Sequence, residues 1–200
     1  MKRILRLISC SLIVLIITQT FASTYSSDPK QFITEIVDEA KLVLNSNVSK
    51  EEKAIKLSQI ALNTVDIKGI GYYTLGSKRK ELSPEELNKY EEIFQKYFLK
   101  SFTSRLTDYS DPKITVLSSE KINEKYTIVK TLLLATEKKP EVKIDWRVYT
   151  KDQEKPLIRD LIVEGLRLAR TQKEEFGSIL SSNNNDINAL FEKLEEFINQ

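Results

Sequence analysis

Three consecutive β-strand patterns, joined by short polar links, constrain the fold more than any other part of the sequence. They are predicted over Tyr126–Thr136, Glu141–Tyr149 and Leu157–Gly165. In the second strand every other residue is apolar: Val142, Ile144, Trp146 and Val148. A period of two places these side chains on one face and the charged side chains on the other. The sequence therefore predicts an antiparallel sheet with one covered face.

Helical patterns occupy the chain on both sides of these strands. Before the strands, helices are predicted to begin at Asp28, Ser49, Asp66 and Ser83, and the last runs to about Asp108. Ile114–Leu117 is predicted as a short first strand, followed by a turn-bearing link over 118–125. Two more helices are expected after Gly165. Helices segregated from antiparallel strands indicate an α+β fold, with a curved sheet of about four strands packed against several helices.

The N-terminus has the pattern of a secretory signal peptide, residues 1–22. Three basic residues precede an apolar run over Leu7–Ile17, and small residues at Thr20 and Ala22 fit a cleavage site. A membrane anchor is disfavoured because the apolar run is too short to span a bilayer comfortably. Cleavage after Ala22 leaves residues 23–200, a length that fits a single domain. An exported protein is therefore expected.

The composition argues against most catalytic and nucleic-acid functions. The chain has no histidine, and its one cysteine, Cys10, lies in the predicted leader. The usual general base and the softest metal ligands are thus missing, so we expect no catalytic residues, no metal and no cofactor. The leader carries 3 of the 31 basic residues, which leaves 28 against 29 acidic residues, a net charge of about −1. Near neutrality argues against a nucleic-acid partner.

The long helix predicted from Pro84 carries a single aromatic-rich stripe. Its apolar residues recur every three or four positions: Leu87, Tyr90, Phe94, Tyr97, Phe98, Phe102 and Leu106. This spacing places them on one face of a helix. Periodicity alone favours an ordinary core, but such a stripe laid across a curved sheet can also form the wall of an apolar cavity.

Several segments together resemble a known family. They are Ile67–Gly76, Leu82–Glu86, the long helix with Phe94, Tyr97, Phe98 and Phe102, Ile144–Arg147, Arg159–Leu166, Glu175–Leu180 and Asp186–Leu190. In this order and spacing they resemble the toluene-tolerance family, which includes the periplasmic phospholipid-binding component of the Mla (maintenance of lipid asymmetry) pathway. Asp160 with Glu164–Gly165 and the Glu-Phe pair downstream is the most specific part. The sequence departs from the family pattern at Arg79, where an aromatic residue is usual, and at Arg167, where serine is usual.

The resemblance implies an NTF2/cystatin-like architecture with a deep apolar pocket for phospholipid acyl chains. It implies a periplasmic carrier that shuttles phospholipid between the outer and inner membranes. The implied partners are an outer-membrane lipoprotein–porin complex, and an inner-membrane complex of a substrate-binding-domain protein with an ABC transporter.

A set of apolar residues predicted to point inward is the candidate lipid-binding site. It comprises Ile70, Leu75, Phe94, Phe98, Phe102, Val116, Ile128, Leu132, Leu134, Ile144, Trp146, Val148, Leu161 and Val163. Arg147, Arg159 and Arg167 are considered for contact with a head group, with plain surface charge as the favoured interpretation.

Three alternatives stay open at this stage. One is a non-catalytic envelope protein that binds another apolar ligand, such as a sterol or hopanoid. A second is a hydrolase that uses a carboxylate pair, although Glu51–Glu52 and Glu195–Glu196 fit solvated helix surfaces better. The third is a structural envelope protein with a filled core.

Overall fold

A computed structural model describes residues 25–200 except 110, 138 and 153. The predicted signal peptide, residues 1–22, and its cleavage site lie outside the described residues. Within the described part of the chain, no helix combines the length and apolar character that crossing a bilayer requires.

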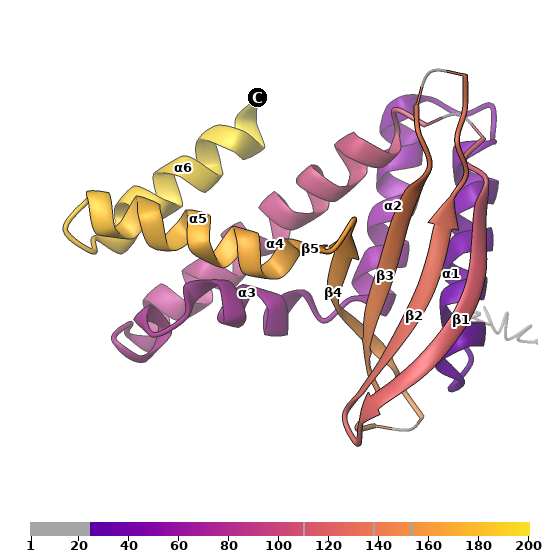
Figure 1. Ribbon diagram of the computed structural model, residues 1–200. Helices are drawn as coiled ribbons and strands as arrows, with labels where there is room; N and C mark the ends of the chain where they lie inside the picture. The colour runs from indigo at the N-terminus through magenta and orange to yellow at the C-terminus, as the bar shows by residue number, and fades with distance from the viewer. Residues whose placement is uncertain (1–24, 110, 138, 153) are drawn as a thin grey trace, which may run out of the picture.

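The described residues form six α-helices and one antiparallel sheet (Figure 1). Before the sheet come α1 (Pro29–Leu44), α2 (Lys50–Thr64), α3 (Ile67–Leu75), the 3₁₀ helix η1 (Lys78–Lys80) and α4 (Pro84–Leu106). After it come α5 (Leu168–Ser182) and α6 (Ile187–Asn199). The predicted α+β class, with helices segregated from strands, is confirmed.

The sheet has the strand order β1-β2-β3-β4-β5, and every neighbouring pair is antiparallel. Its strands are β1 (Ile114–Asn123), β2 (Tyr126–Leu133), β3 (Val142–Tyr149), β4 (Leu157–Val163) and β5 (Leu166–Arg167). Helices α1 and α2 lie behind the sheet in Figure 1, and no described helix covers the face toward the viewer. We call these the inner and outer faces.

Several strand boundaries differ from the sequence-based expectation: β2 ends at Leu133 rather than Thr136, and β3 begins one residue later than predicted. The link predicted over 118–125 is mostly strand, because β1 continues to Asn123 and pairs with β2. This stretch is polar because β1 is an edge strand whose side chains here are exposed. The third predicted strand ends at Val163, since Glu164 and Gly165 both have positive φ (49° and 83°) and turn the chain into β5.

The structure has two apolar cores rather than one. The sheet core lies between the inner face and helices α1 and α2, and includes Phe32, Ile33, Leu57, Val129, Val148 and Ile158. The arm core lies among α3, α4, α5 and α6, and includes Tyr90, Phe94, Phe176, Leu190 and Phe191. In Figure 1 these four helices project sideways from the sheet as an arm, so the fold has a junction between two separately packed lobes.

Helix α4, which connects the two lobes, begins with a complete capping box at Ser83. The Ser83 hydroxyl accepts a hydrogen bond from the Glu86 amide (3.2 Å), and the Glu86 carboxylate accepts one from the Ser83 amide (2.7 Å). We expect Ser83→Ala to lower the free energy of unfolding by about 1 kcal/mol. Ser104→Ala, at an exposed position in the last turn of α4, is the control and should be neutral or slightly stabilising. Urea denaturation measures both.

The same capping box should make the stability of the protein depend on pH. Hydrogen bonds from the backbone and side chain of Ser83 lower the pKa of Glu86. Because the folded-state pKa is depressed, this contribution is present above the unfolded-state pKa and is lost as pH falls through the folded-state pKa. The stability difference between wild type and Glu86→Gln should therefore shrink in acid. A difference that stays constant would mean that the carboxylate half of the box contributes nothing.

Helices α3 and α4 approach each other closely at Gly71. A Cβ added there would lie 2.8 Å from Cδ1 of Phe94, whereas one added at Gly177 in α5 meets no atom within 4 Å. We expect Gly71→Ala to destabilise the protein by about 1–3 kcal/mol through overpacking. Gly177→Ala should stabilise it by up to about 1 kcal/mol, because alanine is the better helix former. Equal urea midpoints for the two variants would contradict this packing of α3 against α4.

Candidate functional site

The register of β2 decides which predicted site residues face inward. Val129 pairs with Trp146 and shares its face, whereas Ile128 and Leu132 pair with charged residues of β3 that point the other way. The expectation that Ile128 and Leu132 lie on the inner face is therefore wrong. Leu134 lies just beyond the end of β2 and is 39% exposed, so it does not belong to an inward strand position either.

Five other predicted residues pack in or against the two cores. Ile70, Leu75 and Phe94 are buried in the arm core, and Val148 is buried in the sheet core. Val116 on β1 is half-buried against the sheet core. These five residues therefore serve as packing residues. For Phe94, the periodicity of the long helix already favoured this role.

The remaining six predicted residues are a half-buried apolar set on β3, β4 and α4, the helix that connects the lobes. We call it the interlobe strip, and it comprises Phe98, Phe102, Ile144, Trp146, Leu161 and Val163. On the sheet, cross-strand pairing places Trp146 beside Leu161 and Ile144 beside Val163. Moving along β3 from Val148, the inner-face residues become half-buried: Trp146 still packs against the sheet core, whereas Ile144 belongs to neither core. Apolar surface left partly open in this way is typical of a ligand-binding region.

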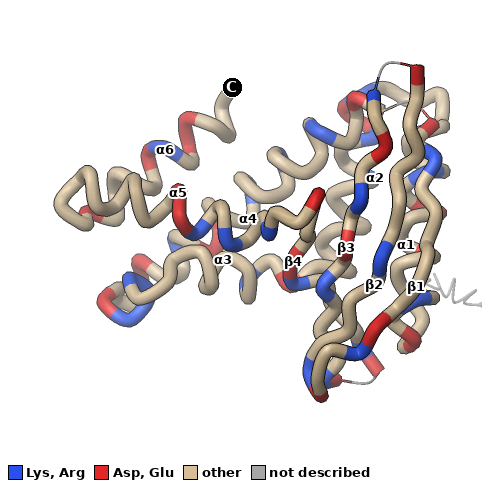
Figure 2. The backbone as a smooth tube through the Cα atoms, in the orientation of Figure 1, with Lys and Arg blue, Asp and Glu red and all other residues tan. Residues whose placement is uncertain are grey.

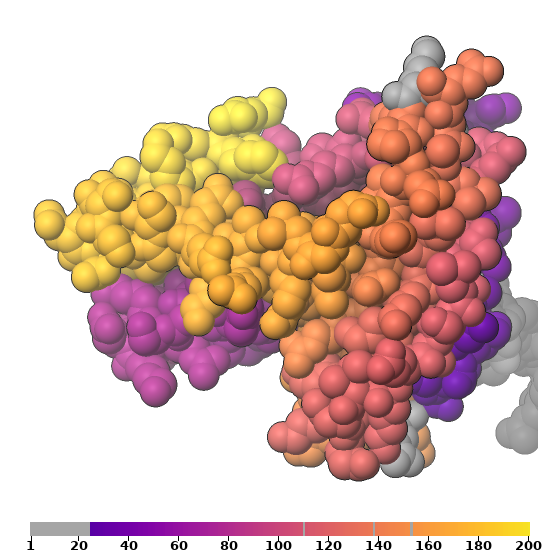
Figure 3. All heavy atoms as spheres, viewed as in Figure 1, coloured from indigo at the N-terminus to yellow at the C-terminus, as the bar shows by residue number. Residues whose placement is uncertain are grey.

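Helix α4 extends the same surface from the arm to the sheet. Phe98 contacts the arm core, and Leu106, two turns later, contacts the sheet core. Between them Phe102 belongs to neither core and stacks on Phe98 with ring centroids 6.1 Å apart. Figure 3 shows α4 at the bottom of the recess between α6 and the sheet. The aromatic side chains of α4 are thus buried at Phe94 and half-buried at Phe98 and Phe102.

The indole of Trp146 is held in a fixed orientation by a residue that the sequence reasoning missed. Its Nε1 donates a hydrogen bond to the Thr131 hydroxyl (3.0 Å), which in turn donates to the carbonyl of Ile144 (2.8 Å). Thr131 and Thr127 are the buried inward residues of β2 on either side of Val129. A period-two Thr-x-Val-x-Thr pattern was the available signal, but the more apolar Ile128 and Leu132 outweighed it.

The arginines considered for a head group do not lie on this strip. Arg147 alternates with Trp146 and therefore points to the outer face. Arg159 donates from Nε to Asp66 (2.6 Å), and Arg167 donates to Asp160 (2.9 Å). Burial alone would lower the pKa of Arg159, but its hydrogen bonds to Tyr126 and Asp66 raise it above its ordinary value. Arg159 and Arg167 are thus structural ion-pair partners as well as surface charges.

A cavity of about 360 Å³ lies between α3 and α4, on the arm. Of the predicted site residues it is lined only by Phe94. At its mouth Glu91 accepts hydrogen bonds from Tyr72 and Lys68. Burial would raise the pKa of Glu91, but these two partners lower it below its usual value. The carboxylate is thus held ionised, which is the opposite of what a general acid requires.

An open antiparallel sheet covered on one face by two helices, with a helical arm at its side, defines an α+β fold with half-buried apolar side chains on α4, β3 and β4. Among solved structures, a phospholipid-binding protein from Ralstonia solanacearum, determined in complex with a phospholipid, has this fold. The TM-score is 0.72 at 16% identity, over 84% of this chain and 95% of that one. Residues 33–196 match the family model described as MlaC protein, and the chain belongs to that family. A search of curated proteins finds no match.

Proposed function

We propose that this protein is a non-catalytic phospholipid carrier of the periplasm. The interlobe strip is the observation that supports this most directly, because its six apolar side chains on α4, β3 and β4 remain half-buried beside the two cores. Membership of the MlaC family and the fold shared with a protein that was crystallised with a phospholipid point to the same ligand class. In this proposal, acyl chains lie against the strip and separate the arm from the sheet.

The energetics of acyl-chain transfer suit a carrier without an energy source of its own. Burial of an acyl chain stabilises by about 0.8 kcal/mol per CH₂, so about 30 methylenes contribute roughly 24 kcal/mol. Removing the lipid from a bilayer costs a similar amount. Transfer between a membrane and a sufficiently deep apolar site is therefore nearly neutral and reversible. Any net direction would have to come from partner complexes, proposed here as the outer-membrane and inner-membrane assemblies of an ABC-transporter-linked system.

The alternatives receive less support. The pKa of Glu91, which lines a described cavity, is lowered by its hydrogen bonds to Lys68 and Tyr72, so Glu91 is unsuited to be the general acid of a carboxylate pair. A sterol or hopanoid would also fit an apolar strip, and the identity of the bound ligand separates that alternative from a phospholipid.

Transfer between vesicles tests the carrier proposal. Donor liposomes that contain a quenched fluorescent phospholipid are mixed with unlabelled acceptor liposomes, with and without the protein. We expect the protein to accelerate transfer in proportion to its concentration, without nucleotide. A rate that does not depend on the protein would contradict the carrier proposal, even if lipid is bound.

A further inference from the structure

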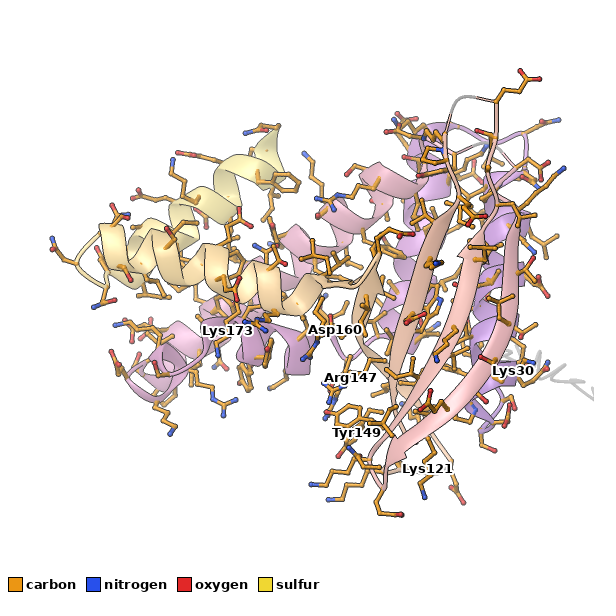
Figure 4. The ribbon with its side chains drawn as sticks, viewed as in Figure 1. Lys30, Lys121, Arg147, Tyr149, Asp160 and Lys173 are labelled. Carbon is orange, nitrogen blue, oxygen red and sulfur yellow. The ribbon has the colours of Figure 1, made fainter. Side chains whose placement is uncertain are left out.

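A second cavity, of about 320 Å³, lies where β3 and β4 approach α3 and the start of α5. Four of its eleven lining residues are arginines: Arg79, Arg147, Arg159 and Arg167. Asp160 is the only acidic residue among those eleven. We call this cavity the arginine groove. Figure 2 shows basic positions gathering where β3 and β4 meet α3, and Figure 4 shows Arg147 and Tyr149 at that side of the sheet, below Asp160.

The groove concentrates positive charge on a chain that is otherwise balanced. The whole sequence has 31 basic and 29 acidic residues, whereas the groove lining has four basic residues and one acidic residue. Asp66 and Asp160 neutralise Arg159 and Arg167. Arg79 and Arg147 form no ion pair with any residue that the structure describes. Two guanidinium groups therefore line one groove without a counter-charge.

The free guanidinium of Arg147 is also held in position. Its Cζ lies 3.7 Å from the ring centroid of Tyr126, which lies 5.3 Å from the ring of Tyr149. Arg159 lies 3.5 Å from the centroid of Tyr149 and donates from Nη1 to the Tyr126 hydroxyl (3.4 Å). The rings cover guanidinium faces and leave N–H edges to bind a ligand. A pre-ordered arginine loses less conformational entropy on binding than a free one.

A strand irregularity contributes to this arrangement. Arg147 pairs with Asp160 and Val148 pairs with Ile158, so Arg159 is an extra, bulged residue of β4. Bulges re-aim side chains next to binding sites. Here the bulge lets Arg159 reach both Asp66 at the start of α3 and the tyrosine rings of the sheet.

We propose that the arginine groove docks an acidic segment of a partner protein, with carboxylates bound by Arg79 and Arg147. The four arginines come from η1, β3, β4 and β5, so the positive charge is spread along the groove and fits several carboxylates better than one small ion. Guanidinium groups bind carboxylates with two parallel hydrogen bonds, and complementary charge speeds association. Because Arg147 and Trp146 point to opposite faces, a partner can dock here without covering the interlobe strip. This proposal does not depend on the carrier function.

Fluorescence anisotropy with a labelled peptide of alternating Glu and Gly tests the proposal at low ionic strength. The wild-type protein should bind this peptide and not the matched Gln/Gly peptide, and added salt should weaken binding through screening. The double variant Arg79→Gln/Arg147→Gln should weaken binding by about tenfold, since each exposed ion pair contributes a modest amount. Arg105→Gln/Lys113→Gln removes the same charge from exposed positions outside the groove and should bind as the wild type does.

Several outcomes would overturn the proposal. They are no binding of the acidic peptide by the wild type, undiminished binding by the groove variant, or an equal loss in the control variant. Competition by millimolar inorganic phosphate, at constant ionic strength, would reassign the groove to a small anion. Lipid content, measured by native mass spectrometry on the same variants, should remain unchanged. A groove variant that loses peptide binding but keeps its lipid would show that docking and lipid carriage depend on different sites.

Discussion

Trp146→Lys should lose its phospholipid, whereas Leu132→Lys should keep it. Trp146 occupies the centre of the interlobe strip, where an ammonium group would have to be desolvated beside acyl chains, so bound lipid should fall by about tenfold or more. Leu132 carries the same substitution on the outer face, because it lies opposite Lys143 across β2 and β3. Phosphorus analysis of protein purified without detergent measures the lipid bound by each variant.

A second strip variant keeps this prediction testable if Trp146→Lys fails to fold. Val163 lies at the end of β4 and belongs to neither core, so Val163→Lys disturbs the strip with less effect on packing. Circular dichroism and urea denaturation establish that each variant is folded. A folded Trp146→Lys or Val163→Lys protein with wild-type lipid content would show that the strip is not the lipid site. Loss of lipid from Leu132→Lys would indicate that the lipid binds on the outer face of the sheet, which contradicts the proposed site.

Asp160→Ala should lower the free energy of unfolding by about 3 kcal/mol, because it leaves the buried amide of Ala169 without an acceptor and removes the ion-pair partner of Arg167. The Asp160 side chain is 1% exposed. One of its oxygens accepts from Arg167 Nε (2.9 Å) and the other from the amide of Ala169 (3.0 Å). Because Ala169 lies in the first turn of α5, this carboxylate joins the sheet to the arm. Urea denaturation followed by tryptophan fluorescence gives the free energy.

Asp38→Ala is the matched control for that change. Asp38 pairs with Lys41 one turn away on α1, and its side chain is 62% exposed. Loss of such a surface pair should cost less than about 0.5 kcal/mol. If Asp160→Ala were as stable as Asp38→Ala, the link from β4 to α5 would not stabilise the fold.

The sequence predicted the elements of this fold better than their faces. The caps predicted at Asp28, Ser49 and Ser83 are observed at helix starts, because a capping side chain is a local signal. The alternation in β3 correctly placed Trp146 and Val148 on one face. The predicted inner face of β2 was wrong. Both faces of β2 carry residues that favour strands, so only the pairing with β3 decides which face turns inward.

The division into two cores could not be predicted from periodicity. Phe94 and Phe102 lie on one helical stripe, yet Phe94 is buried and Phe102 is half-exposed at the junction. Whether a stripe residue becomes core or surface depends on where neighbouring helices end, which is a property of tertiary packing. The stacking contacts among Arg147, Tyr126, Tyr149 and Arg159 could not be predicted for the same reason. These residues are distant in sequence and meet only through strand pairing.

Native mass spectrometry of the mature protein, purified from a periplasm without detergent, tests the central claim most directly. We predict a species heavier than the bare chain by one or two phospholipids, which are released on denaturation and identified by their fragments. A bare chain that also takes up no lipid from added liposomes would contradict phospholipid carriage and leave the interlobe strip without its proposed ligand.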